Sequence, residues 1–148
     1  MNVEEIIKTE KKLSLSARTM IHLALVSNKL REAFSCALRP YDMSEQQFNV
    51  LRILRGQQRK PANLSTINER MVTKMSNTTR LVDKLILKGL VDREICAQNR
   101  RKVEITITEK GLNLLNELDE VVQKTENILL KNFTEKELYE LNQLLDKF

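Results

Sequence analysis

The chain has 148 residues, 41% of them hydrophobic and 30% charged, with a net charge of +5 and only 3 Gly and 2 Pro. A chain of this length can bury one core without disulfides. It contains no run of about 18 apolar residues that could span a membrane and no apolar core of a signal peptide. We therefore expect a cytoplasmic protein without a membrane partner. With one His, two Cys, no phosphate-binding glycine loop and no Ser/His/Asp set, we also expect no enzyme, no metal site and no cofactor.

The first long helix is expected from about Ser16 to Leu38. Residues 13–38 contain no Gly or Pro, and Pro40 disfavours helical backbone in the residue before it. Apolar residues occupy more than one side of this helix, so it needs to be covered from several directions.

The next segments suit two shorter helices joined by a loop. MSEQQFNVLRIL begins with Ser44 and carries Gln47 three residues later, a capping-box pattern that starts a helix. GQQRKPAN is then expected as a loop and LSTINERM as a short helix. The side chains expected to be buried are Phe48, Leu51, Leu54, Leu64, Ile67 and Met71.

A third short helix is expected from Ser76, as its N-cap, to Lys88. Gly89 is well placed to end it, because glycine readily adopts left-handed backbone. Leu81, Val82 and Leu85 form the apolar face of this helix.

After Gly89 the apolar residues change from a helical spacing to strict alternation. LVDREIC and KVEITIT are therefore expected as two strands, with AQNRR as the turn between them. Val103, Ile105 and Ile107 lie on one face of the second strand, so the hairpin is expected to pack on the domain through that face.

Two helices are expected to complete the chain. Thr108 is the expected N-cap of a helix over residues 109–131, and TEKE at 134–137 is a second capping-box pattern, which starts the last helix. The expected fold class is mainly α with a small β-hairpin.

The order of helices followed by a hairpin is that of a winged helix-turn-helix, whose second helix enters the major groove of DNA with its N-terminal residues at base edges. In this chain that end reads KMSNTTR, with short polar side chains that can donate and accept hydrogen bonds. The residues of this helix expected to contact DNA are Lys74, Ser76, Asn77, Thr78, Thr79, Arg80 and Lys84. The alternative is that Ser and Thr only cap the helix and that Arg80 is a solvated charge.

The hairpin turn carries Arg100, Arg101 and Lys102, which we expect to contact DNA because a narrow minor groove favours arginine. The alternative is a turn that is basic only for solubility. Charge distribution favours DNA: from Arg52 to Lys102, 13 Lys and Arg stand against 4 Asp and Glu, a net charge of +9, whereas the rest of the chain has −4. A confined basic region is typical of a surface that binds a polyanion.

Residues 43–111 resemble the multiple antibiotic resistance regulator (MarR) family of bacterial transcription factors. The matching stretches are MSEQQFNVLRIL, TTRLVDKLILKGLVDR and NRRKVEITITEKG. The family's wing pattern Asp-Arg-Arg is NRR at 99–101, and its Leu-Thr-x-x-Gly is ITEKG at 107–111. Asn99 stands in place of the aspartate, so it can accept a hydrogen bond there but cannot form an ion pair.

The resemblance implies a single domain over residues 1–148, with a DNA-binding lobe at 43–111 and dimerisation helices at 13–38 and 112–148. It implies a homodimer on a pseudo-palindromic site in double-stranded DNA, with half-sites about 10 bp apart. It also implies a small effector, often aromatic and anionic, that binds between the dimer region and the lobe. The function implied is a sequence-specific, ligand-responsive transcriptional repressor.

Three alternatives remain at this point. The fold also suits a winged-helix module that contacts protein or RNA without reading DNA bases. Cys36 and Cys96 could sense oxidants, but we expect both to be inert apolar fillers. Tyr41 could line a pocket, and simple packing is its alternative role.

Overall fold

The computed structural model describes residues 2–58, 60–73, 77–95 and 103–148. The expected fold class, mainly helical with a two-stranded antiparallel hairpin, is confirmed. The elements in chain order are α1 (Val3–Ile6), α2 (Leu15–Leu38), the 3-10 turn η1 (Arg39–Tyr41), α3 (Glu45–Gly56), α4 (Leu64–Arg70), α5 (Thr78–Leu87), β1 (Val91–Ile95), β2 (Val103–Ile107), α6 (Glu109–Leu130) and α7 (Glu135–Leu145).

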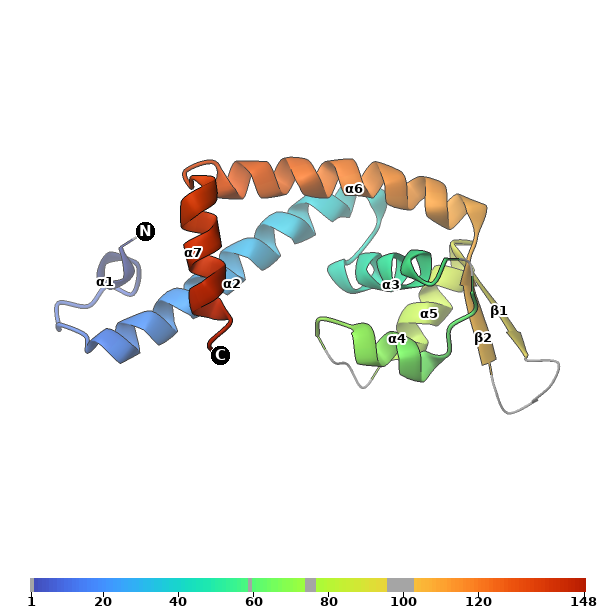
Figure 1. Cartoon of the computed structure of the whole chain (residues 1–148), viewed down its shortest axis with the longest axis horizontal. Coiled ribbons are helices and arrows are strands. Elements are labelled where there is room, and N and C mark those ends of the chain that lie inside the picture. The colour runs from blue at the N-terminus through green and yellow to red at the C-terminus, as the bar shows by residue number, and fades with distance from the viewer. Residues whose placement is uncertain (1, 59, 74–76, 96–102) are drawn as a thin grey trace.

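The elements divide into a lobe and a set of terminal helices (Figure 1). The lobe consists of α3, α4, α5 and the hairpin, at one end of the molecule. The terminal helices are α1, α2, α6 and α7. Figure 1 shows the long α6 running from the hairpin along one edge of the molecule, and α1, α7 and both chain ends lying at the end away from the hairpin.

Local hydrogen bonds start α3, α6 and α7 where the sequence predicts them. Ser44 and Gln47 form a complete capping box at α3, and Thr134 forms one with Glu137 at α7. The hydroxyl of Thr108 accepts from the backbone N–H of Gly111 at 2.9 Å and starts α6. Each cap satisfies backbone N–H groups that the first helical turn leaves without partners.

Helices α2 and α5 do not begin at the residues that the sequence predicts. Helix α2 begins at Leu15, because Ser14 caps it by accepting from the N–H of Ala17. Helix α5 begins at Thr78 with Asn77 as N-cap, so the expected start at Ser76 is wrong, and Ser76 itself lies outside the described residues.

Helix α1 was not predicted from the sequence. It has four residues, too few to be stable alone, and tertiary contacts hold it on α2. The guanidinium of Arg18 donates to the carboxylate of Glu4 at 2.9 Å, and Val3 is fully buried. This ion pair also contributes to a lowered pKa of Glu4, for which the largest cause is a backbone hydrogen bond within α1.

The hairpin is joined to the lobe through β2. Strands β1 and β2 pair in antiparallel register from Val91 opposite Ile107 to Ile95 opposite Val103. Ala62, in the segment expected as a loop, forms an isolated bridge with Ile105, with backbone hydrogen bonds of 2.9 and 2.8 Å. This bridge extends the sheet across the chain segment that leads into α4.

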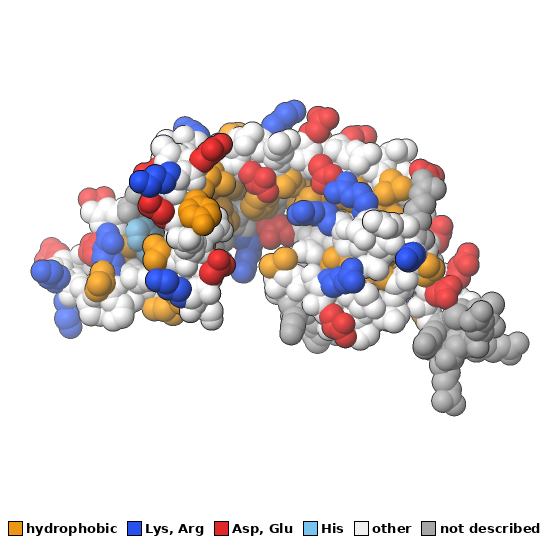
Figure 2. Space-filling model, in the orientation of Figure 1, with side chains coloured by type: hydrophobic (Ala, Val, Ile, Leu, Met, Phe, Trp, Pro, Cys, Tyr) orange, Lys and Arg blue, Asp and Glu red, His pale blue; other side chains and the backbone are white. Residues whose placement is uncertain are grey.

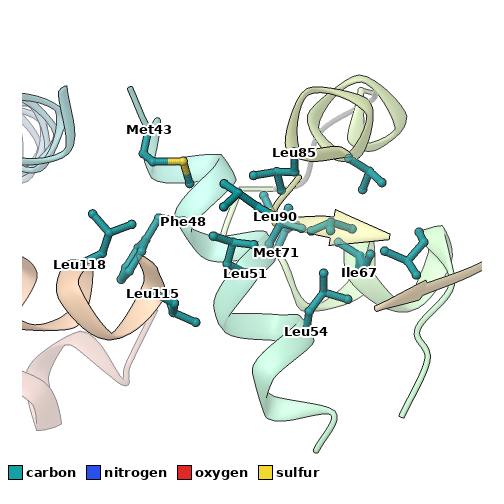
Figure 3. Close-up of a cluster of buried hydrophobic side chains, with 14 of the residues drawn as sticks. Met43, Phe48, Leu51, Leu54, Ile67, Met71, Leu85, Leu90, Leu115 and Leu118 are labelled. Carbon is teal, nitrogen blue, oxygen red and sulfur yellow. The ribbon is translucent and has the colours of Figure 1, made fainter. Parts of the chain in front are cut away.

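The core sits where α3 meets α5, α6 and the hairpin. Figure 3 shows Leu51 and Leu54 of α3 among side chains from α4, α5 and α6. The expected apolar face of β2 is confirmed, since Ile105 is fully buried and Val103 and Ile107 pack against the core. The same core includes Leu38 and the following residues from other elements: Met43, Phe48, Ile67, Met71, Val82, Leu85, Leu90, Leu115 and Leu118. The lobe is therefore packed directly onto α2 and α6.

Candidate functional site

Helix α5 presents a polar and basic face to solvent. Thr79, Arg80 and Lys84 are exposed, whereas Val82 and Leu85 on the other side are fully buried. Asn77, just before the helix, is half-buried. Of the ten residues expected to contact DNA, these four described residues are accessible and lie along one short segment.

Thr78 is the one buried residue among the described residues that are expected to contact DNA. Its side chain is 7% exposed, and its hydroxyl donates to the side-chain oxygen of Asn68 in α4 at 3.0 Å. In the structure Thr78 holds α5 against α4. Direct contact of its side chain with DNA stays a prediction.

The other end of α5 is fixed by polar contacts with two further elements. The ammonium group of Lys88 contacts the carboxylate of Asp42 at 2.9 Å and donates to the backbone carbonyl of the same residue. Lys110 of α6 donates to the carbonyl of Lys88 at 2.8 Å, and the Thr108 hydroxyl donates to the carbonyl of Gly89 at 2.9 Å. Gly89 has φ +70°, as expected for the residue that ends the helix.

The hairpin contacts α5 through an ion pair. Arg93 of β1 donates to the carboxylate of Asp83 of α5 at 2.5 Å. Each side chain keeps more than a third of its surface exposed, so the pair contributes little to stability. The expected DNA contacts Lys74, Ser76, Arg100, Arg101 and Lys102 lie outside the described residues, as does Asn99.

A cavity of about 200 Å³ lies where the terminal helices meet the lobe. Its walls come from the C-terminal part of α2, α3 from Glu45 to Arg52, the segment after α4, and α6. Figure 2 shows the molecule hollowed below α6, between the terminal helices and the lobe. The principal apolar lining residues are Phe34, Leu38, Phe48, Met71 and Val122, and the charged ones are Glu45, Arg52 and Glu126.

The charged groups of this cavity have distinct surroundings. The Arg52 guanidinium lies 5.7 Å from the centre of the Phe48 ring, a cation–π distance. Burial raises the pKa of Glu45, and the nearby Arg31 opposes that shift only in part. The Oε1 atom of Glu45 is buried without a hydrogen-bond partner among the described residues.

A family model described as the MarR family matches residues 43–103, which cover most of the lobe. Over 93% of this chain and 100% of the other, the chain is 30% identical to a MarR transcription factor from Planctomyces limnophilus, with a TM-score of 0.73. The chain belongs to the MarR family. The likeness extends beyond the matched lobe, because the aligned structures include the terminal helices.

Two further solved structures resemble the chain. Wild-type MarR from E. coli, in its apo form, is 26% identical over 93% of this chain and 98% of the other, with a TM-score of 0.71. The organohalide-sensing transcriptional regulator RdhR-CbdbA1625, solved in a 2,4-dichlorophenol-bound form, has a TM-score of 0.83 over 92% of this chain and 80% of the other. At 19% identity, the second likeness shows the fold alone.

The terminal helices of this MarR-family chain carry many exposed apolar side chains. Helix α7 has no buried residue, although five of its 11 residues are apolar: Leu138, Tyr139, Leu141, Leu144 and Leu145. The exposed large apolar residues of these helices and their flanks are Ile6, Ile7, Leu15, Met20, Val26, Leu30, Ile128, Leu130, Phe133, Tyr139, Leu141, Leu144, Leu145 and Phe148. There are more of them than isolated apolar surface residues would explain, which indicates a surface that another molecule covers.

The remaining residues considered from the sequence have less to do with this site. Cys36 is exposed on α2, so it is not a core filler in the single chain, and Cys96 lies outside the described part. Tyr41 packs against the core, as its simpler interpretation expected. Within the described ranges, no cluster of potential ligands could hold a metal ion, and no helix is long and apolar enough to span a membrane.

The sequence did not predict the residues that hold α5 in place or the charged residues that line the cavity. Asn68, Asp83 and Asp42 act through partners 10 to 46 positions away. No local pattern marks such pairs. The sequence marks Glu45 only as the first residue of a capped helix, where an acidic side chain is common because it interacts favourably with the helix dipole.

Proposed function

We propose that this MarR-family chain is a non-enzymatic regulator of transcription that binds a specific, pseudo-palindromic site in double-stranded DNA as a homodimer. A small effector bound in the cavity changes its affinity for that site, and repression is the expected direction. The exposed polar face of α5 carries the proposal, because a recognition helix needs accessible donors, acceptors and cations at its N-terminal end.

The arrangement around α5 supports its role as the reading element. Asn77, Thr79 and Arg80 lie at its start, and Lys84 lies one turn further on the same exposed side. Arg80 suits a guanine edge or a phosphate, and Lys84 suits a phosphate. Arg100, Arg101 and Lys102 follow β1, which the contact between Arg93 and Asp83 joins to α5, and we propose that they contact the neighbouring minor groove.

The exposed apolar surface of the terminal helices supports the homodimer. A second copy of the same chain would cover the same surface on both partners in a two-fold interface. Two-fold symmetry places two α5 helices in successive turns of the major groove, so the half-sites would lie about 10 bp apart.

The cavity supports ligand response. It is bounded on one side by α2 and α6 and on the other by α3 and the segment that leads towards α5. A molecule that fills it would contact both the terminal helices and the lobe, and could favour one orientation of the lobe over another. The 2,4-dichlorophenol-bound form of RdhR-CbdbA1625 supports a small aromatic molecule as one effector class in this fold.

Salt-dependent binding distinguishes this proposal from a module that contacts only protein or RNA. We expect tight binding to a duplex from upstream of the chain's own gene, with affinity falling by several decades between low and moderate salt, because a dimer displaces counterions from about 6 to 10 phosphates. Single-stranded RNA of the same sequence should bind weakly. Equal binding to RNA, or no preference among duplex sequences, would contradict base-specific DNA recognition.

A further inference from the structure

The C-terminal end of α5 is joined to both long terminal helices. The ammonium group of Lys88 contacts the carboxylate of Asp42 at 2.9 Å and donates to the backbone carbonyl of the same residue. Asp42 follows η1, and its own N–H donates to the carbonyl of Arg39 at 2.9 Å, which ties it to the end of α2. On the other side, Lys110 of α6 donates to the carbonyl of Lys88 at 2.8 Å. The end of α5 is therefore held at the end of α2 and at the start of α6.

Asp42 combines an unusual backbone conformation with a charge. Its φ is +51°, in the left-handed region that few residues other than Gly, Asn and Asp adopt. The side chain of Lys88 is 28% exposed and that of Asp42 is 94% exposed, so their ion pair contributes little to the stability of the fold. An effect of Asp42 on DNA binding is therefore separable from an effect on folding.

Reading of bases is sensitive to the orientation of α5. The residues expected at base edges lie at its start, whereas Lys88 and its partner Asp42 lie at its end. A helix of 10 residues is about 15 Å long, so a tilt of about 4° about one end moves the other end by about 1 Å. The usual range of N–H···O hydrogen-bond lengths spans only about 0.5 Å. Contacts at the end of α5 can therefore decide whether its start reaches the bases.

We propose that Asp42 is a positioning residue for DNA recognition, which sets the orientation of α5 relative to α2 through its ion pair with Lys88 and does not itself contact DNA. The inference rests on the proposed function, because Asp42 has this role only if α5 reads DNA. The contact of Thr78 with Asn68 does not replace this ion pair, since it joins α5 to another helix of the lobe and not to α2. An acidic residue thus supports the DNA contacts of the polar and basic residues of α5.

Asp42→Asn tests this role by the sign of its effect on DNA affinity. Asparagine keeps the size of the side chain and tolerates left-handed backbone, but it forms no ion pair with Lys88. It also makes the chain more positive by one charge, which alone would tighten binding to any duplex.

We expect Asp42→Asn instead to weaken binding to the duplex that the unmodified chain selects, and not to weaken binding to an unrelated duplex. The expected loss is about two- to fivefold, because losing an exposed ion pair lowers the population of the binding-competent orientation by no more than about this factor. Glu120→Gln, which removes one negative charge at an exposed position of α6, is the control and should not weaken binding to either duplex. Urea denaturation of each variant measures whether the fold is intact.

Lys88 and Lys84 are two lysines one turn apart on α5 that distinguish positioning from contact with DNA. Lys88→Met should weaken binding to the selected duplex without changing the salt dependence of that binding, because no phosphate contact is lost. Lys84→Met should weaken binding to all duplexes alike and lower the slope of the salt dependence by about 1, as expected for a phosphate contact. Asp42→Asn combined with Lys88→Met should weaken binding no more than Lys88→Met alone, since both remove the same ion pair.

A folded Asp42→Asn chain that binds the selected duplex as tightly as the unmodified chain, or more tightly, would overturn the positioning role. Equal weakening on the selected and the unrelated duplex would also overturn it. If Lys88→Met lowered the salt slope as much as Lys84→Met, Lys88 would be a phosphate contact and the role of Asp42 would fail with it. An unmodified chain that selects no duplex at all would instead refute the proposed regulatory function.

Discussion

Gly111 is the residue where the start of α6 comes closest to the base of the hairpin. A Cβ atom at this position would lie 2.2 Å from the carbonyl oxygen of Leu90 and 2.8 Å from a side-chain carbon of Ile107. Backbone cannot move aside as a flexible side chain can. The glycine is therefore required by close packing, although it sits inside a helix, where glycine is normally unfavourable.

Gly111→Ala should lower the free energy of unfolding by about 1 to 3 kcal/mol, because the added methyl group overlaps the Leu90 backbone. Gly56→Ala is the matched control, since a Cβ atom there meets nothing within 4 Å, and it should be neutral or stabilising by up to about 1 kcal/mol. Urea denaturation of both variants measures the difference. A Gly111→Ala chain as stable as the unmodified one would contradict the close approach.

Thr78→Val should lower the free energy of unfolding by about 1 kcal/mol without changing the preferred DNA sequence. Valine keeps the shape but loses the hydroxyl that donates to Asn68, and α4 is then held less firmly to α5. Thr79→Val, at the exposed neighbouring position, should leave stability unchanged. Thermal unfolding and sequence selection together test this, and a new DNA preference at unchanged stability would instead place Thr78 at the DNA.

At the scale of elements, the ion pair between β1 and α5 links the hairpin to the proposed recognition helix. Arg93→Ala and Asp83→Ala should each weaken DNA binding, and a double-mutant cycle should give a coupling free energy in DNA affinity of about 0.5 kcal/mol or more, because both changes release the same contact. The same cycle measured on the free energy of unfolding should give a smaller coupling free energy, since the pair is largely exposed.

The exposed pair Lys136 and Glu140 on α7 is the control for that cycle, because its removal changes the charges of the chain in the same way. It should show no coupling in DNA affinity. If the two pairs behaved alike, Arg93 would act only through its charge and not by orienting the hairpin.

The elements whose signals are local were predictable from the sequence, and those that depend on distant partners were not. The caps at Ser44 and Thr134 are complete within four residues, so their patterns marked the starts of α3 and α7. Helix α1 and the Ala62 bridge form only through contacts with residues far along the chain. The exposed face of α5 was predictable from helical spacing, whereas the burial of Thr78 depends on where α4 lies.

At the scale of the whole molecule, the terminal helices account for the proposed symmetry of the DNA site. Leu144→Arg should convert a dimer to a monomer in sedimentation velocity, because it places a charge in the apolar surface of α7, where Leu144 is 58% exposed in the single chain. Leu87→Arg, at an 87% exposed position of α5, should leave the dimer intact. A monomeric unmodified chain would contradict the interface.

The cavity and the core connect these helices to the lobe. Leu38 of α2 and Leu115 and Leu118 of α6 are fully buried in the same cluster as the lobe's own core residues. A change in how α2 and α6 pack would therefore alter the position of α5 relative to α5 of the second copy in the proposed homodimer. Effector binding and DNA binding would be coupled through this shared packing, and each would change the affinity for the other.

Sequence selection from random duplex DNA is the most direct measurement of whether the exposed face of α5 reads bases. The unmodified chain should select a two-fold symmetric sequence with half-sites about 10 bp apart. Replacing Asn77, Thr79 and Arg80 together by alanine should abolish or change that preference while leaving salt-dependent, non-specific binding in place. Selection of the same sequence by the folded triple variant would contradict the assignment of α5 as the recognition helix.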